Sequence, residues 1–133
     1  MSNRIVVRFR DGKMLKGNTT DFVPTRDIFH VIPADAPTGS PPVDVYLREL
    51  KAVFFVKDYK GDSDYHEKHD FAADKLSMGR KIRVEFSDGE VIIGTTQGYR
   101  PDRPGFFIIP VDPKSNIERC YVLTDATKEV EWL

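Results

Sequence analysis

One pattern of residues occurs twice in this 133-residue chain, and this repetition constrains the fold more than any other feature. Residues 4–35 align without a gap with residues 81–112, at an offset of 77, and 13 of the 32 aligned positions are identical. The identities include the pairs Asp11-Gly12 and Asp88-Gly89. Self-similarity at one fixed spacing is typical of a duplicated structural unit. The sequence therefore predicts two copies of one small unit in one molecule.

Each copy has the residue pattern of a β-structure. Apolar and polar residues alternate over 4–10 and 81–87, which places one face of a strand in a core and the other in water. The Asp-Gly pairs then predict tight hairpins of type I′, in which both central residues have positive φ. A second strand is predicted over 13–22 and 90–99, and Gly17 and Gly94 inside it favour a sharp bend. A third strand over 28–33 and 105–110 ends at a proline.

Two further strands complete each copy, near 43–50 and 51–59 and near 119–125 and 128–133. Five short strands with a bent second strand predict a small antiparallel barrel. We therefore predict an all-β protein of two tandem small barrels, at 1–56 and 80–133, docked as a pseudo-twofold pair. The segment 57–79 is predicted to be a partly helical linker, with Asp64 as an N-cap.

The composition argues against several function classes. The net charge is -1, so the chain lacks the positive field that drives nonspecific phosphate binding. No apolar run approaches the roughly 20 residues of a membrane span, and the first residues do not form a signal peptide. The single Cys120 cannot form an internal disulfide, which suits a reducing compartment. We predict a cytoplasmic protein without a cofactor or a membrane partner.

The order of strand, Asp-Gly, bent strand, loop and strand resembles the first motif of Sm and Sm-like small barrels, and the strand number also suits an SH3-like barrel. "VYLRELKAVFFV" resembles the second Sm motif, in which Leu47 and Arg48 fit but Glu49 replaces a glycine. The resemblance implies a nucleobase site that uses an Asn and this Arg. Asp27 stands at the Asn position, and the second copy has Leu123-Thr124-Asp125 at the second motif, so the resemblance supports the fold more than RNA binding.

A closer resemblance extends over nearly the whole chain. "KAVFFVKDY", a linker with "GD" and Tyr, and "GRKIRVEFSDGE" followed by "GTT" and "GFF" are similar to an uncharacterised bacterial domain family, and Gly79 to Asn116 carry most of the pattern. Some members of that family lie beside signalling modules such as PilZ. The resemblance implies no activity.

Two repeated loops are the first candidate for a binding surface. Each carries an aromatic residue, a proline, an arginine and a phenylalanine at fixed spacing, which places Phe22 with Arg26 and Tyr99 with Arg103. Arginine beside aromatic faces binds phosphate, bases or carboxylates. The alternative is structural: proline fixes the loop, and the arginine pairs with the repeated Asp35 or Asp112. The candidate binding residues are Phe22, Arg26, Tyr99 and Arg103 from these loops, together with Arg48 from the segment that resembles the second Sm motif.

A second candidate site lies in the linker. "DSDYHEKHD" contains His66 and His69, which would share one face of a helix, among four acidic residues. The spacing matches neither a zinc-protease motif nor a calcium loop, and a polar linker has the same composition. Neither a nucleophile motif nor a nucleotide-binding loop is present in the sequence.

These observations favour a non-catalytic interaction or adaptor module that binds a protein or peptide. The first alternative is an Sm-like nucleic-acid-binding protein that uses Arg26, Arg48 or Arg103, and the second is a metal-dependent enzyme that uses the linker cluster. The partner's identity and a homo-oligomeric state are left open by the sequence.

Overall fold

The chain forms a single antiparallel sheet of ten strands. The fold is described from a computed structural model, and the described residues are 3–59, 79–112 and 115–133. The strands are β1 (Asn3–Phe9), β2 (Met14–Thr19), β3 (Ile28–Pro33), β4 (Val43–Tyr46), β5 (Leu50–Val56), β6 (Arg80–Phe86), β7 (Val91–Thr96), β8 (Gly105–Pro110), β9 (Ile117–Leu123) and β10 (Thr127–Trp132). Two short 3₁₀ helices, η1 (Leu47–Glu49) and η2 (Thr124–Ala126), precede β5 and β10.

The expected all-β class is confirmed, and the strands lie near the expected residues. Strand pairing in the N-terminal half recurs in the C-terminal half. In the first hairpin Asn3 lies opposite Thr19, and in the second Arg80 lies opposite Thr96, a shift of 77 residues at both positions. The same shift relates the pairing of β1 with β5 to that of β6 with β10, where Ile5 lies opposite Phe55 and Ile82 opposite Trp132.

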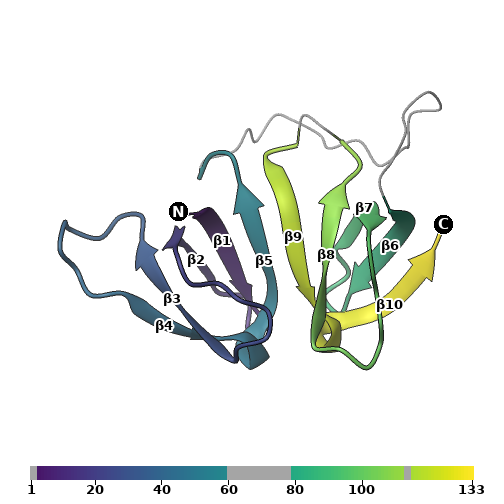
Figure 1. Cartoon of the computed structure of the whole chain (residues 1–133), viewed down its shortest axis with the longest axis horizontal. Coiled ribbons are helices and arrows are strands. Elements are labelled where there is room, and N and C mark those ends of the chain that lie inside the picture. Colours follow the sequence, from purple (N-terminus) through teal and green to yellow (C-terminus); the bar gives the residue numbers. More distant parts are fainter. Residues whose placement is uncertain (1–2, 60–78, 113–114) are drawn as a thin grey trace.

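The two halves join edge to edge through β5 and β9 (Figure 1). A pseudo-twofold pair would bring equivalent strands together. Instead the fifth strand of the first half pairs with the fourth strand of the second, with Ala52 opposite Val122 and Phe54 opposite Cys120. The expected pseudo-twofold docking is therefore wrong, and the halves are arranged head to tail.

The Asp-Gly hairpins also differ from expectation. Among the described residues only glycines have positive φ, including Gly12 and Gly89, so Asp11 and Asp88 do not adopt the type I′ conformation. The Gly12 N–H donates to the Phe9 carbonyl at 3.1 Å, and the Phe9 N–H donates to the Lys13 carbonyl at 2.9 Å. This is the geometry of a three-residue loop that ends in a left-handed glycine.

Gly17 and Gly94 occupy positions where two strands approach closely. A Cβ at Gly17 would overlap the carbonyl oxygen of Ile32, and one at Gly94 would overlap that of Ile109. The sequence predicted a sharp bend at these glycines, and the structure shows a close approach to the third strand at both of them.

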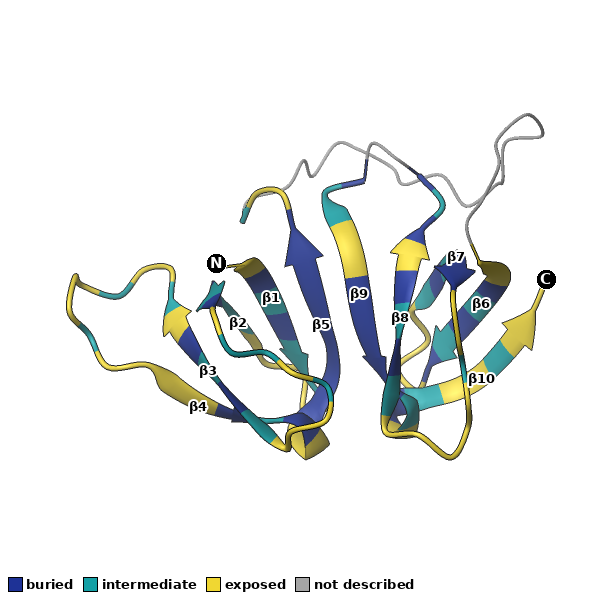
Figure 2. Ribbon diagram, in the orientation of Figure 1, coloured by how far each residue is buried: buried dark blue, intermediate teal, exposed yellow. Residues whose placement is uncertain are grey.

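The most completely buried strand is β5, at the edge where the two halves join. Every residue of β5 is buried, whereas β4 and β10 at the two ends of the sheet carry exposed residues (Figure 2). Alternate residues of β1 and β6 fill the interiors of the two halves, among them Ile5, Val7, Ile82 and Val84, each with 0% exposure. Because β5 contacts both halves, its apolar composition is explained by its central position.

A lysine provides a second link between the halves. Lys51 of β5 has a buried side chain whose Nζ donates to Asp88 Oδ2 at 2.7 Å and to Glu90 Oε1. The same Nζ lies 4.6 Å from the ring centroid of Phe86. The hydrogen bond from Lys51 holds the pKa of Asp88 below its usual value.

No helix in the described part of the chain is long and apolar enough to cross a membrane. The linker helix predicted between the halves falls on residues 60–78, outside the described residues.

Candidate binding groove between the two halves

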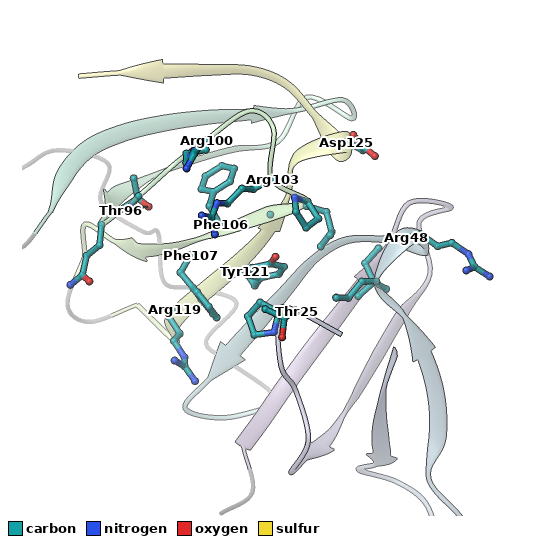
Figure 3. A pocket seen from close by; sticks show the side chains of 18 of the residues that line it. Thr25, Arg48, Thr96, Arg100, Arg103, Phe106, Phe107, Arg119, Tyr121 and Asp125 are labelled. Carbon is teal, nitrogen blue, oxygen red and sulfur yellow. Dashed lines mark hydrogen bonds between the residues drawn. The ribbon is translucent and has the colours of Figure 1, made fainter. Parts of the chain in front are cut away.

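An open groove of about 950 Å³ lies where the two halves meet. We call it the junction groove. Its C-terminal wall consists of residues from the β7–β8 loop and from β8, β9 and η2, and its N-terminal wall consists of residues from the β2–β3 loop and η1, with Arg10 and Leu50. Figure 3 shows that the labelled arginines and aromatic residues come mainly from the C-terminal half.

The floor of the junction groove is aromatic. Tyr121 of β9 and Phe107 of β8 lie with ring centroids 5.0 Å apart, edge to face. Phe22 from the N-terminal half packs against both, at 5.5 Å from Tyr121 and 6.4 Å from Phe107. Edge-to-face rings stabilise such contacts beyond the area they bury. Burial raises the pKa of the Tyr121 hydroxyl above its usual value.

Arginines dominate the charge of the junction groove. Five arginines line it together with two carboxylates: Arg10, Arg48, Arg100, Arg103 and Arg119, with Asp27 and Asp125. Arg119 lies over the rings of Phe55 and Phe107, at 4.3 and 5.2 Å from their centroids. This stacking holds the Arg119 guanidinium against the two rings.

The other arginines differ in how they are held. Arg48 lies 4.9 Å from the ring centroid of Tyr46, and Arg100 pairs with Asp102 at 3.3 Å on the surface. No described residue forms a hydrogen bond or ion pair with the guanidinium of Arg103, which lies beside Phe106 in Figure 3. The five N–H donors of this guanidinium are therefore not used by the described residues.

Backbone hydrogen bonds fix the two repeated loops in the same way. The Arg26 N–H donates to the Val23 carbonyl at 3.0 Å, and the Arg103 N–H donates to the Arg100 carbonyl at 3.1 Å. In the second loop the Thr124 hydroxyl also donates to the Arg103 carbonyl at 2.9 Å. The backbone that carries Arg103 is thus anchored to η2, whereas its side chain is exposed.

The structure brings together only part of the predicted site. Arg48 and Arg103 line the junction groove, and Phe22 packs against its floor. Arg26 is exposed and does not line the groove. Tyr99 belongs to another cluster, where its ring lies 4.7 Å from Phe106 and 5.9 Å from Trp132.

Sequence reasoning missed Arg119, Tyr121 and Phe107, which form much of the groove. Their offset partners in the first half are Pro42, Asp44 and His30, so the aromatic and basic residues occur in one copy only. This difference between the two copies is the feature of the sequence that could have identified the three groove residues.

A smaller polar cluster lies near the β4 end of the sheet. His30 Nδ1 lies 2.6 Å from Asp21 Oδ2, and His30 Nε2 lies 3.3 Å from Asp44 Oδ1. The hydrogen bond with Asp21 raises the pKa of His30. Burial raises the pKa of Asp21, but the hydrogen bonds from His30 and Thr19 outweigh this effect, and the net pKa is below its usual value.

The linker candidates His66 and His69 lie outside the described residues. Within the described ranges, no group of three or more His, Cys, Asp or Glu side chains is arranged to hold a metal ion.

Comparison with known proteins identifies a family but no activity. A family model, DUF6982, described as a family of unknown function, matches residues 1–133. No curated protein and no solved structure shows significant similarity to the chain. Because the match extends over the whole sequence, the chain belongs to the DUF6982 family.

Proposed function

We propose that this protein is a non-catalytic interaction module that binds an extended acidic segment of a partner protein in the junction groove. The observation that carries the proposal is the uncompensated guanidinium of Arg103 above an aromatic floor, in a groove with more arginines than carboxylates. Arginine binds carboxylates through paired, charge-assisted hydrogen bonds.

The size of the groove suits a short peptide. Its volume of about 950 Å³ is at the upper end of the range for small-ligand pockets. Ile109, which lines the groove and is 49% exposed, would accept one apolar side chain, while Arg100 and Arg103 would bind flanking carboxylates. A segment with an apolar residue between acidic residues therefore matches the groove.

The aromatic residues favour a polypeptide over a nucleic acid. Single-stranded nucleic acids bind by stacking bases on open aromatic faces. Here Arg119 already lies over Phe55 and Phe107, and Tyr121 is only 3% exposed.

The proposal extends to the origin of the two halves and to the cellular location of the protein. We propose that the two halves derive from one Sm-like or SH3-like small barrel, a view supported by the strand pairing that recurs with a shift of 77 residues. The charge and shape of the groove suit a binding role. A cytoplasmic location is proposed because the lone Cys120 is buried and needs no oxidising compartment.

A binding experiment with defined probes tests this function. The full chain, labelled with ¹⁵N, is titrated with the acetylated peptide Glu-Leu-Glu-Phe-Glu-Leu, with its Lys-for-Glu analogue and with an eight-nucleotide single-stranded RNA. We expect only the acidic peptide to shift amide signals along the groove, and we expect Arg103→Glu to weaken it at least tenfold. Arg26→Glu, the equivalent change outside the groove, is the matched control and should change affinity less than twofold.

Two outcomes would overturn the proposal. If the RNA binds and the acidic peptide does not, the nucleic-acid-binding alternative replaces it. If neither probe shifts groove signals, or if Arg26→Glu weakens the acidic peptide as much as Arg103→Glu does, the groove is not the binding site.

A further inference from the structure

The two halves have equivalent strand edges, of which one is covered and the other is open. β5 and β10 are the fifth strands of their halves, and Val53 and Phe55 of β5 correspond to Val130 and Trp132 of β10. The outer edge of β5 is paired with β9, whereas β10 lies at the end of the sheet. Figure 2 shows β5 as buried along its whole length and β10 as mostly exposed.

The same aromatic group stands beside both edges. In the first half the Phe22 ring lies 5.1 Å from Phe29 and 5.5 Å from Phe55. In the second half the equivalent Tyr99 ring lies 4.7 Å from Phe106 and 5.9 Å from Trp132.

The two aromatic groups differ in what covers them. Phe107 and Tyr121 from the C-terminal half close over the first group, and Phe55 is 4% exposed. Trp132 of the second group is 37% exposed. Arg80 covers one face of its ring, with the guanidinium carbon 3.9 Å from the ring centroid.

The backbone of β10 is oriented to receive another strand. The Leu133 N–H donates to the Lys81 carbonyl at 3.0 Å, toward β6. Successive residues of a strand point their backbone groups in opposite directions, so those of Val130 and Trp132 point to the open edge. In the described part of the chain no strand pairs with them. An unpaired edge of this kind is a template for strand addition.

The pairing of β9 with the β5 edge indicates which residues a strand would need in order to pair with the open β10 edge. On β9, Tyr121 lies opposite Val53 and its ring packs on the aromatic group, while Cys120 and Val122 lie opposite Phe54 and Ala52. At the open edge the positions of Phe54 and Ala52 are taken by Glu131 and Glu129. Opposite charges on facing strand residues stabilise a pair. The fitting strand therefore carries an aromatic residue between two basic residues.

A second copy of this chain fits the edge poorly. Its free fourth strand, β4, has Asp44 where β9 has Tyr121, and the neighbouring strand β3 has His30 where β8 has Phe107. Pro41 and Pro42 precede β4 and lack the N–H groups that strand pairing needs. Prolines and charged residues of this kind blunt a sheet edge against pairing.

We propose that the outer edge of β10 receives an antiparallel strand of a partner protein that carries an aromatic residue flanked by lysine or arginine. The aromatic side chain lies against Tyr99 and Trp132, and the basic side chains pair with Glu129 and Glu131. The residues proposed to contact the added strand, which are Tyr99, Glu129, Glu131 and Trp132, do not line the junction groove, and the inference does not depend on the function proposed for the groove.

A synthetic copy of β9 provides the probe. The peptide spans residues 117–123 with Cys120→Lys and Val122→Lys, and it lacks tryptophan. Since Trp132 is the single tryptophan of the protein, its fluorescence reports directly on this edge. We expect a saturable shift of Trp132 emission to shorter wavelength, which is absent with the analogue that has glutamate at both positions. Tyr99→Ala and Glu131→Lys should each weaken binding at least tenfold.

Matched variants separate this edge from the other sites. Asp44→Lys, a charge reversal at the opposite edge of the sheet, and Arg103→Glu in the groove should each change the affinity less than twofold. Circular dichroism and the thermal midpoint of each variant verify that it is folded.

Three outcomes would overturn the proposal. The first is the absence of a saturable Trp132 response. The second is that a peptide with the natural Cys120 and Val122 binds as tightly as the lysine peptide and that Glu131→Lys does not weaken it. This result would mean that the peptide replaces β9 beside β5. The third is concentration-dependent dimerisation in light scattering that both Trp132→Glu and Asp44→Lys abolish, which would make a second copy the occupant.

Discussion

At the scale of single residues, the two glycines of the bent strands have the clearest structural role. Gly94 is buried, and its backbone lies against the carbonyl of Ile109, where a side chain has no space. Gly98, four residues later, has no atom within 4 Å of the position where a Cβ would lie. The two positions therefore form a natural comparison.

Gly94→Ala should lower the free energy of unfolding by about 1–3 kcal/mol or more, because the added methyl group forces β7 and β8 apart. Gly98→Ala should leave stability unchanged or raise it slightly, because the unfolded chain loses freedom. Urea denaturation followed by circular dichroism measures both. Equal effects of the two substitutions would contradict the close approach at Gly94.

His30 gives stability a specific pH dependence. Its pKa is raised above 6.5 by Asp21, so its contribution is complete below 6.5 and is lost as pH rises through the raised pKa. The pKa of Asp21 is below 3.8, so its contribution is present above 3.8 and is lost as pH falls through the lowered value. The pair therefore stabilises the fold most between these two limits.

His30→Gln should consequently reduce the thermal midpoint at pH 5.5 and have a smaller effect at pH 8.5. Differential scanning calorimetry at the two pH values measures this, and NMR titration of the His30 ring gives its pKa directly. A pKa at or below 6.5, or an equal loss at both pH values, would refute the role of Asp21.

At the scale of elements, Lys51 connects β5 to the β6–β7 hairpin. Its side chain is 7% exposed, whereas those of its partners Asp88 and Glu90 are 54% and 48% exposed. The offset-equivalent Lys128 of β10 pairs with Glu85 at 3.6 Å and is 68% exposed. Burial thus distinguishes two lysines that occupy equivalent strand positions.

Lys51→Ala should cost about 1.5–3 kcal/mol, since it removes charged hydrogen bonds, with a value near the lower end because both carboxylates reach water. Lys51→Met should cost less, because an apolar side chain of similar length can still pack beside the Phe86 ring. Lys128→Met is the control and should change stability by less than about 0.5 kcal/mol. Chemical denaturation of the three variants measures these differences, and a Lys128 effect as large as that of Lys51 would contradict this account.

The sequence allowed the strands to be predicted well but their turns and joining less well. Alternation over residues 4–10 and 81–87 and the glycine in each second strand followed from local physics. The Asp-Gly turns were assigned wrongly because the same dipeptide occurs in a three-residue loop, in which only the glycine needs positive φ. Phe22, Arg48 and Arg103 carry recognisable local patterns, and the structure places Arg48 and Arg103 in the lining of the groove and Phe22 against Tyr121.

The remainder depends on contacts between distant residues. Arg119 became a groove residue because β9 pairs with β5 and places it over Phe55. No local pattern encodes which strand of one half meets which strand of the other. Tyr99 and Phe22 have equivalent positions in the sequence, and they differ in role only because one lies at the joined edge and the other at the open edge.

At the scale of the whole molecule, the continuous sheet should make the two halves unfold together. Leu50 of β5 has 0% exposure in the N-terminal half, and Trp132 lies in the C-terminal half. If the two halves unfold together, a substitution that destabilises the N-terminal half must also shift the unfolding transition measured by Trp132 in the C-terminal half.

Leu50→Ala should destabilise the protein by about 2–5 kcal/mol and shift the urea midpoint of Trp132 fluorescence together with that of circular dichroism. A Trp132 transition that stays at its wild-type midpoint while circular dichroism shifts would show that the halves unfold independently.

The pairing of β5 with β9 has a consequence for biosynthesis. The ribosome makes Leu50–Val56 long before Ile117–Leu123, so the nascent N-terminal half displays an unpaired strand that is apolar except for Lys51 while some sixty further residues are translated. An exposed edge of this kind is prone to aggregation, and pairing over such a sequence distance forms slowly. Chaperone dependence during translation should therefore be concentrated in this interval and end when β9 has emerged.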